Sequence, residues 1–129
     1  MSKADDLQAR AEAFADVSIQ FVDGLPKGLI SQRMGGQLLD CSTSVASNYR
    51  AARRGRSHDE FTAKLGVVSE EADECVYWLT RFKKARICSS VALEPLLTEA
   101  IELSKIFAAS ARTARSRRKR RRPGDPPVR

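Results

Sequence analysis

Residues Ser57 to Phe82, SHDEFTAKLGVVSEEADECVYWLTRF, contain the clearest structural pattern in the chain. Ser57 and Glu60 have the spacing of a capping box, in which the serine hydroxyl accepts from the Glu60 amide while the glutamate side chain reaches back. This spacing predicts the start of a helix. Apolar residues then recur at alternating intervals of four and three, a pattern typical of a bundle helix. They are Phe61, Leu65, Val68, Ala72, Cys75, Leu79 and Phe82.

Three further segments show the same helical period. The first begins near Leu7 and ends at Gly24-Leu25-Pro26, because proline disfavours helix at the residue before it. The second runs from about Gly28 to Arg54 and has Gly55 as its C-terminal cap. The last regular helix is expected from about Glu94, which keeps Pro95 in the first turn, and its apolar face ends at Ala111.

The order of these segments predicts an all-α fold. The link Arg54-Gly55-Arg56-Ser57 is so short that the helices on either side of it must be antiparallel. Repetition of this arrangement gives an up-down-up-down four-helix bundle, and Gly35-Gly36 inside the second helix predicts close helix packing. We expect residues 1–114 to form one domain and residues 115–129 to form a separate tail.

The charge of the chain is concentrated at its C-terminus. From Arg112 to Arg129 there are nine basic side chains and one acid, Asp125, whereas the preceding 111 residues hold 14 basic and 15 acidic ones. The net charge of +7 therefore resides in this segment. Because its apolar face has ended and Pro123 prevents continued helix, residues 115–129 are expected to be disordered when free.

A nearly neutral body with a cationic tail favours binding to a polyanion. Arginine binds phosphate bidentately, and the tail has no aromatic residue to stack on unpaired bases, so we expect non-specific contact with nucleic acid. A tail that is only solubilising, or merely tolerated, is the alternative. The predicted contacts are Arg115, Arg117, Arg118, Lys119, Arg120, Arg121 and Arg122.

A second basic patch at the end of the second helix consists of Arg50, Arg53, Arg54 and Arg56, and the first three are the predicted secondary contacts for nucleic acid. A structural role is the stronger of the two interpretations of this patch. Cations favour a helix C-terminus, and these side chains can also pair with Asp59 and Glu60 across the turn.

Catalytic and metal-binding patterns are weak. His58 is the only histidine, and we expect it to be solvated in the first turn of its helix, without the orienting partner that a general base needs. The cluster Glu70, Glu71, Asp73 and Glu74 is interpreted as a solvated acidic face or as a surface for ion pairs between subunits, because di-iron bundles need Glu-x-x-His pairs. No glycine-rich phosphate loop is present. We therefore predict no enzymatic activity, no metal and no cofactor.

The sequence predicts a cytoplasmic protein with no role at a membrane. Its N-terminus has no apolar signal region, and no run of about 18 apolar residues is present. Its three cysteines are Cys41, Cys75 and Cys88. Their odd number and irregular spacing indicate reduced thiols, with Cys41 and Cys75 as small core residues.

The run from Gly36 to Arg50, GQLLDCSTSVASNYR, resembles the signature of a small bacterial four-helix-bundle family. That family includes proteins encoded in intervening sequences of large-subunit ribosomal RNA genes. The resemblance extends through Ser57–Gly66, Glu70–Leu79 and Leu93–Leu97 and covers about residues 7 to 115. It implies a left-handed bundle that assembles as a homopentamer around a central opening. The arginine-rich tail is not a feature of the family, and Asp40-Cys41 replaces its usual Arg-Ser.

Together these patterns predict a non-enzymatic, oligomeric bundle that binds RNA, rather than DNA, through basic tails gathered near one end of a ring. The chain is also distantly similar to the accessory protein of diversity-generating retroelements, which is basic and binds a reverse transcriptase and nucleic acid. The alternative function is therefore a protein-interaction scaffold that docks a reverse transcriptase. A structural bundle without any ligand is the third possibility.

Overall fold

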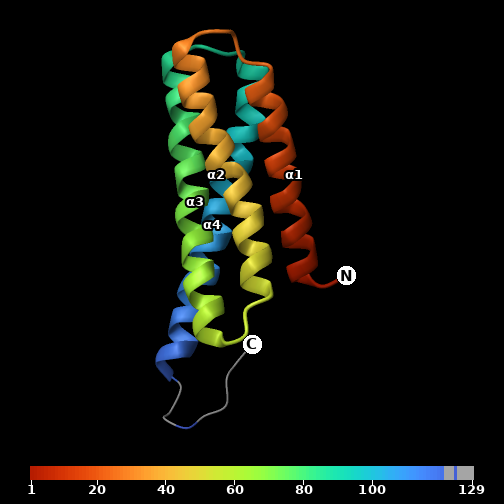
Figure 1. The fold of residues 1–129 in the computed structure, drawn as a ribbon, viewed down its shortest axis with the longest axis vertical. Coiled ribbons are helices and arrows are strands. Elements are labelled where there is room, and N and C mark those ends of the chain that lie inside the picture. Colours follow the sequence, from red (N-terminus) through yellow and green to blue (C-terminus); the bar gives the residue numbers. More distant parts are fainter. Residues whose placement is uncertain (121–123, 125–129) are drawn as a thin grey trace.

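The computed structural model describes residues 1–120 and Gly124, with the backbone alone at positions 119 and 120. This part of the chain forms four helices and no strand: α1 (Lys3–Asp23), α2 (Leu29–Arg53), α3 (His58–Ala85) and α4 (Ser90–Arg120). A short link reverses the chain after each of the first three helices (Figure 1). The predicted all-α, up-down-up-down four-helix bundle is therefore confirmed.

The helices follow one another around the bundle in chain order. α1 packs on α2, α2 on α3 and α3 on α4, and α1 closes the circle on α4 through the smallest of these interfaces. At the end of the bundle where α3 begins, α4 extends past the N-terminus of α1 (Figure 1). The last turns of α4 are therefore supported by α3 and not by α1.

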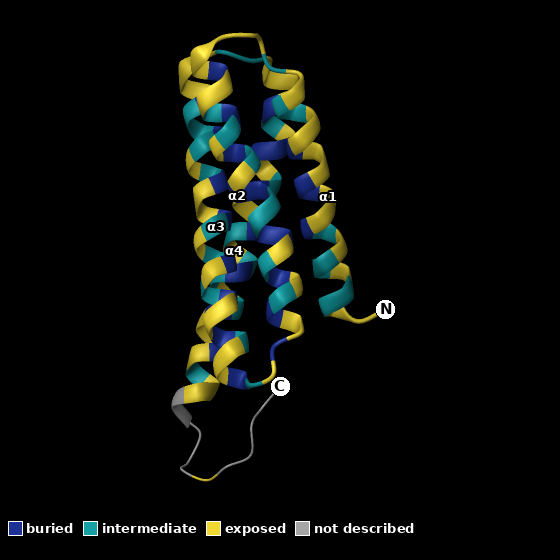
Figure 2. Cartoon of the chain, in the orientation of Figure 1, coloured by how far each residue is buried: buried dark blue, intermediate teal, exposed yellow. Residues whose placement is uncertain are grey.

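The apolar stripes face inward along the whole bundle, as Figure 2 shows. Two aromatic pairs cross the core between diagonally opposite helices. Phe21 of α1 meets Phe82 of α3 with ring centroids 5.5 Å apart, and Tyr49 of α2 meets Phe107 of α4 at 5.2 Å. Both are edge-on contacts, which contribute about 0.5–1.5 kcal/mol each beyond the burial of their area. These pairs tie together helices that share no other close interface.

The start of α3 confirms half of the predicted capping box. The Ser57 hydroxyl accepts from the Glu60 amide at 3.1 Å, as expected. The Glu60 side chain, however, accepts from the amide of Arg56 at 3.4 Å and not from that of Ser57. A complete capping box occurs instead at α1, where Ser2 and Asp5 satisfy each other's backbone amides.

Close packing of helices explains one of the two neighbouring glycines in α2. A Cβ atom on Gly35 would lie 3.0 Å from Cγ1 of Val22 and 3.3 Å from Cδ1 of Leu25, so α1 and its link approach α2 closely there. A Cβ atom on Gly36 would meet nothing within 4 Å. The prediction of close packing is therefore confirmed for Gly35 and wrong for Gly36.

The fourth helix begins one turn earlier than predicted, at Ser90 and not near Glu94. The Ser89 hydroxyl accepts from the Val91 amide at 3.1 Å, and its carbonyl accepts from the Leu93 amide at 3.2 Å. Pro95 therefore lies inside the helix, where it lacks the amide that would bond the Val91 carbonyl. Val91 is 84% exposed, so water can solvate that carbonyl and the proline is tolerated.

The end of α4 corrects a second prediction. The helix continues to Arg120, so the expected disorder is wrong for residues 115–120. The apolar face also continues for one more turn, because Ala114 is only 3% exposed against α3. The remainder of the predicted tail, residues 121–123 and 125–129, lies outside the described residues.

Candidate nucleic-acid interface

The two basic segments predicted from the sequence meet at one end of the bundle. In an up-down bundle the C-termini of α2 and α4 point the same way, and Figure 1 shows both at the end opposite the α1–α2 link. We call this end, formed by the last turns of α2 and α4 and the first turns of α1 and α3, the basic end. Its exposed arginines are Arg50, Arg53, Arg54, Arg56, Arg112, Arg115, Arg117 and Arg118.

Arg53 is occupied by a contact within the chain. Its Nη2 atom donates to Oδ1 of Asp5 at 2.6 Å, and its Nη1 atom donates to Oε1 of Gln8 at 3.4 Å. The hydrogen bond to Asp5 raises the pKa of Arg53, and the same bond lowers the pKa of the Asp5 carboxyl. Of the two roles left open for Arg53, the geometry supports the structural one, with Asp5 as its partner in place of Asp59 or Glu60.

Arg50 and Arg54 lie on the solvent side of the same patch. Together with Arg53, Gln8 and Glu12 they line a surface hollow of about 380 Å³. Two exposed guanidinium groups beside a single glutamate leave this hollow with a positive balance. It therefore suits an anionic group of the size of a phosphate better than a neutral ligand.

The basic segment of α4 presents Arg112, Arg115, Arg117 and Arg118 on a helix. Nε of Arg118 lies 3.0 Å from Oδ1 of Asp59, and both side chains are more than half exposed, at 58% and 59%. Ion pairs as exposed as this contribute only about 0–1 kcal/mol, so Arg118 can exchange Asp59 for a phosphate at little cost. The side chains of Lys119 and Arg120, and all of Arg121 and Arg122, lie outside the described residues.

His58 is not solvated, and the prediction that it would be was wrong. The side chain is 3% exposed because the last turns of α4 cover it. Its Nε2 atom lies 2.9 Å from the carbonyl oxygen of Ala114, and since a carbonyl only accepts, Nε2 carries the proton and donates. The ring also packs near Phe61, with centroids 6.2 Å apart. His58 therefore joins α3 to α4.

Sequence reasoning missed this role, although one signal was available. His58 precedes Phe61 by three residues and Leu65 by seven, so it continues the apolar stripe of α3 by one position. What concealed it was the expectation that α4 ends near Ala111, which leaves nothing to cover the first turn of α3.

Acidic side chains accompany the arginines at the basic end. Asp5 lies in the first turn of α1, and Asp59 and Glu60 lie in the first turn of α3. Carboxylates favour helix N-termini because of the helix dipole, as arginines favour the C-termini. The positive potential therefore follows α2 and α4, and a polyanion is expected to approach over these two helices.

Elsewhere in the part of the chain that the structure describes, no comparable constellation is found. Among the described residues, no cluster of three or more His, Cys, Asp or Glu side chains could hold a metal ion. In the acidic cluster of α3, burial raises the pKa of Glu71, with further contributions from Glu74, Glu70 and Asp40. Within residues 1–120, none of the helices combines the length and apolar character needed to cross a bilayer.

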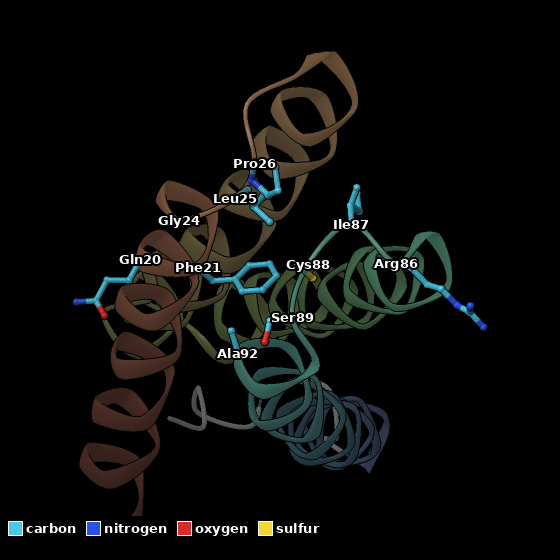
Figure 3. A pocket seen from close by; sticks show the side chains of 10 residues that line it. All are labelled: Gln20, Phe21, Gly24, Leu25, Pro26, Arg86, Ile87, Cys88, Ser89 and Ala92. Carbon is cyan, nitrogen blue, oxygen red and sulfur yellow. The ribbon is translucent and has the colours of Figure 1, made fainter.

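A hollow of about 460 Å³ lies at the opposite end of the bundle, between the α1–α2 and α3–α4 links (Figure 3). Phe21, Leu25, Ile87 and Cys88 are among its lining residues, and burial raises the pKa of the Cys88 thiol. The Arg86 side chain extends away from Phe21 in Figure 3. This hollow is therefore lined by both polar and apolar side chains, and its one arginine, Arg86, sets it apart from the cluster of arginines at the basic end.

The fold and the charge distribution define a four-helix bundle with one strongly basic end. The family model described as 23S rRNA-intervening sequence protein matches residues 5–109, and the chain belongs to this family. The match ends before Arg112, so it does not include the basic segment of α4. No curated protein matches the chain.

One similar solved structure is the crystal structure of a protein with unknown function from the S23 ribosomal protein family of Bacteroides thetaiotaomicron. It shares 22% sequence identity and a TM-score of 0.74, over 86% of this chain and 99% of that chain. At this level of identity the similarity supports the fold alone.

Proposed function

We propose that the protein is a non-enzymatic, oligomeric bundle that binds nucleic acid, RNA rather than DNA, at its basic end. The observation that carries this proposal is the convergence of exposed arginines from two helices that are separate in sequence. Arg50 and Arg54 come from α2, and Arg112, Arg115 and Arg117 come from α4. The choice of RNA rests on the association of the family with the genes of 23S ribosomal RNA, after whose intervening sequences it is named.

The contacts expected at this end are to phosphate and not to bases. Guanidinium groups bind phosphate oxygens in pairs, and each neutralised phosphate releases counterions, so affinity falls as salt rises. Phe107 is the last aromatic residue of the chain and is fully buried. Without an exposed aromatic in this segment, unpaired bases have no platform for stacking, and binding is expected to be independent of sequence.

Assembly into a homopentamer, which the family resemblance implies, is part of this proposal. Large apolar side chains remain exposed on the single subunit, as expected for surfaces that pack in an oligomer. A ring would place five basic ends together, so weak individual contacts with one RNA would combine into a stronger one. The most exposed of these side chains on the helices are Val17, Leu29, Ile30, Tyr77 and Val91.

Salt-dependent binding of labelled RNA tests the proposal. The basic-end variant carries Arg115→Gln, Arg117→Gln and Arg118→Gln. Its matched control carries Lys27→Gln, Lys84→Gln and Arg86→Gln, which remove the same charge at the opposite end of the bundle. Fluorescence anisotropy at several salt concentrations gives the affinity and the salt slope of each.

The basic-end variant is expected to bind more weakly and to lose about two units of slope, since each phosphate contact contributes about 0.7–0.9. The control should retain the wild-type slope. Equal effects of the two variants would mean that net charge alone attracts RNA and that the basic end is not the site.

A protein-interaction scaffold, such as one that docks a reverse transcriptase, is the second candidate. A separate observation favours it: a hollow of about 590 Å³ between α1 and α2 is lined by Val22, Leu25, Pro26 and Leu39 among others. Such an apolar surface suits a protein partner better than RNA. Neighbouring genes separate the two candidates: a reverse transcriptase encoded beside a template repeat favours the scaffold, whereas a place inside a ribosomal RNA operon favours RNA binding.

A further inference from the structure

The arginines nearest the body of the protein are presented by a formed helix. α4 is regular through Arg120, and Ala111 and Ala114 bury its inner face against α3. A flexible tail would bring the same charges to any polyanion. A formed helix brings them in a fixed arrangement, which restricts the shapes of nucleic acid that it can fit.

His58 fixes the position of this helix. It is buried, and it donates from Nε2 to the Ala114 carbonyl at 2.9 Å, one turn before Arg118. Because α4 is helical through Arg120, the Ala114 carbonyl also accepts from the Arg118 amide, so His58 adds a second, buried hydrogen bond that joins α3 to this turn of α4. The neighbouring pair Asp59–Arg118 is exposed and adds little. His58 is therefore the main polar anchor of the segment.

One face of the segment carries hydroxyl groups beside a guanidinium. Ser110, Thr113 and Arg117 recur at intervals of three and four, so they lie on one side of α4. With His58 and Phe61 they line a hollow of about 380 Å³ between α3 and α4. Hydroxyl groups can donate to and accept from a ribose 2′-hydroxyl, while Arg117 can bind the adjacent phosphate.

These features favour a rigid partner over a flexible one. Ordering the backbone of a free residue costs about 1–2 kcal/mol of conformational entropy. In a formed helix this cost is already met during folding, so binding of the helix to a rigid partner is less opposed by entropy. Double-stranded RNA is recognised mainly by shape and by contacts to its 2′-hydroxyls and phosphates across a shallow minor groove. Single strands gain most from aromatic stacking, and the described part of α4 beyond Phe107 has no aromatic residue.

We propose that the basic end recognises double-stranded RNA through the preformed C-terminal turns of α4, and that His58 is the positioning residue of these turns. The inference rests on the proposed function, because it specifies the form of RNA bound at the same site. The position at which it can be tested is Ser116, which lies beyond Ala114, the last buried side chain of α4 among those described.

Ser116→Pro breaks the helix there and leaves every charge in place, and Ser116→Ala is the matched control that keeps the helix. The probes are an RNA duplex and an RNA single strand with equal numbers of phosphates. Ser116→Pro is expected to weaken duplex binding by about tenfold or more while single-strand binding stays unchanged. Equal duplex affinity of the two variants would overturn the inference and leave only a charged tail.

Amide hydrogen exchange without RNA tests the anchor independently. His58→Leu is expected to speed exchange at residues 115–118 and to weaken duplex binding, while exchange in α2 stays slow. His58→Gln retains a side-chain N–H donor and is expected to restore part of the slow exchange and part of the duplex affinity. Rapid exchange of these amides in the wild-type protein would refute a preformed helix.

The two hypotheses fail in different ways. If the triple arginine variant binds RNA as well as the wild type, the proposed function is wrong. If that variant loses binding but Ser116→Pro does not, only the preformed helix is wrong. Should His58→Leu unfold the protein, Ser116→Pro still decides the question, since its effect is confined to the end of α4, from Arg112 onward.

Discussion

The guanidinium group of Arg10 on α1 holds the carboxylate of Glu99 on α4 with two hydrogen bonds. Nη2 donates to Oε1 at 2.6 Å and Nε donates to Oε2 at 2.8 Å, while Nη2 also lies 3.3 Å from Oε1 of Glu102. α1 and α4 form the smallest interface of the bundle. A bidentate ion pair thus closes the bundle where apolar packing is thinnest.

Replacement of Arg10 is therefore expected to destabilise the fold. The two side chains are 36% and 31% exposed, so we expect Arg10→Ala to lower the free energy of unfolding by only about 1 kcal/mol. Arg10→Lys keeps the charge but loses the paired geometry, and should recover only part of this. Urea unfolding of both variants, with Glu99→Gln completing a double-mutant cycle, measures the coupling. Additive effects would contradict a direct interaction.

The two glycines of α2 are expected to respond differently to alanine. Gly36→Ala should stabilise the protein by about 0.5–1 kcal/mol, because its Cβ has open space and alanine favours a helix interior. Gly35→Ala should lose most or all of this gain, since its Cβ would lie 3.0 Å from Cγ1 of Val22. Thermal unfolding compares the two directly. Equal gains would show that α1 moves aside without cost.

Glu71 is expected to make stability depend on pH. Burial and the neighbouring Glu74 and Glu70 raise its folded pKa above the ordinary value of 4.5. It therefore favours folding when protonated, and this contribution is lost as pH rises through the folded pKa. Glu71→Gln should stabilise the protein at pH 7 by about 0.5 kcal/mol or less, and the gain should vanish below about pH 4. Asp73→Asn, an exposed site on the same helix, is the control; an equal gain there would contradict the explanation.

The three thiols are expected to react in a fixed order. Cys41 and Cys75 are buried with their Sγ atoms 3.3 Å apart, and this contact, together with burial, raises the pKa of Cys75. Cys88 is partly exposed. Because the thiolate is the reactive form, iodoacetamide should modify Cys88 first, and the buried pair only after unfolding. Mass spectrometry of native and urea-treated protein gives the order. Early labelling of Cys75 would show that the core opens locally.

Release of Arg118 is expected to strengthen RNA binding. Asp59→Asn removes the acid that lies 3.0 Å from Arg118, and because the pair is exposed the fold should lose little stability. RNA affinity should rise, because Arg118 no longer has to exchange Asp59 for the phosphate that it binds, while the salt slope should stay that of the wild type. Asp6→Asn makes the same change of charge in the first turn of α1 and should raise the affinity less. Equal gains in affinity for the two variants would mean that Asp59 acts through its charge alone and not through Arg118.

The periodicity of apolar residues predicted α3 well and failed at both ends of α4. The stripe from Phe61 to Phe82 predicted α3 closely, because side chains three and four residues apart share a face whatever surrounds them. The end of α4 was misjudged because alanine and arginine were taken as the loss of an apolar face. Ala114 alone continues that face, and it is buried because it packs against α3. At the other end of α4, Pro95 was taken to mark the first turn, whereas the helix begins at Ser90 and includes the proline.

The amino-acid sequence was enough to predict four amphipathic helices, their antiparallel order and the concentration of positive charge at the C-terminus. These properties depend on neighbours within a few residues. Which polar side chains are free depends on the folded arrangement, since Arg53 meets Asp5 from 48 positions away and His58 meets Ala114 from 56. Such partners are chosen by the packing of whole helices, because the strength of a hydrogen bond or an ion pair depends on distances that no local pattern encodes.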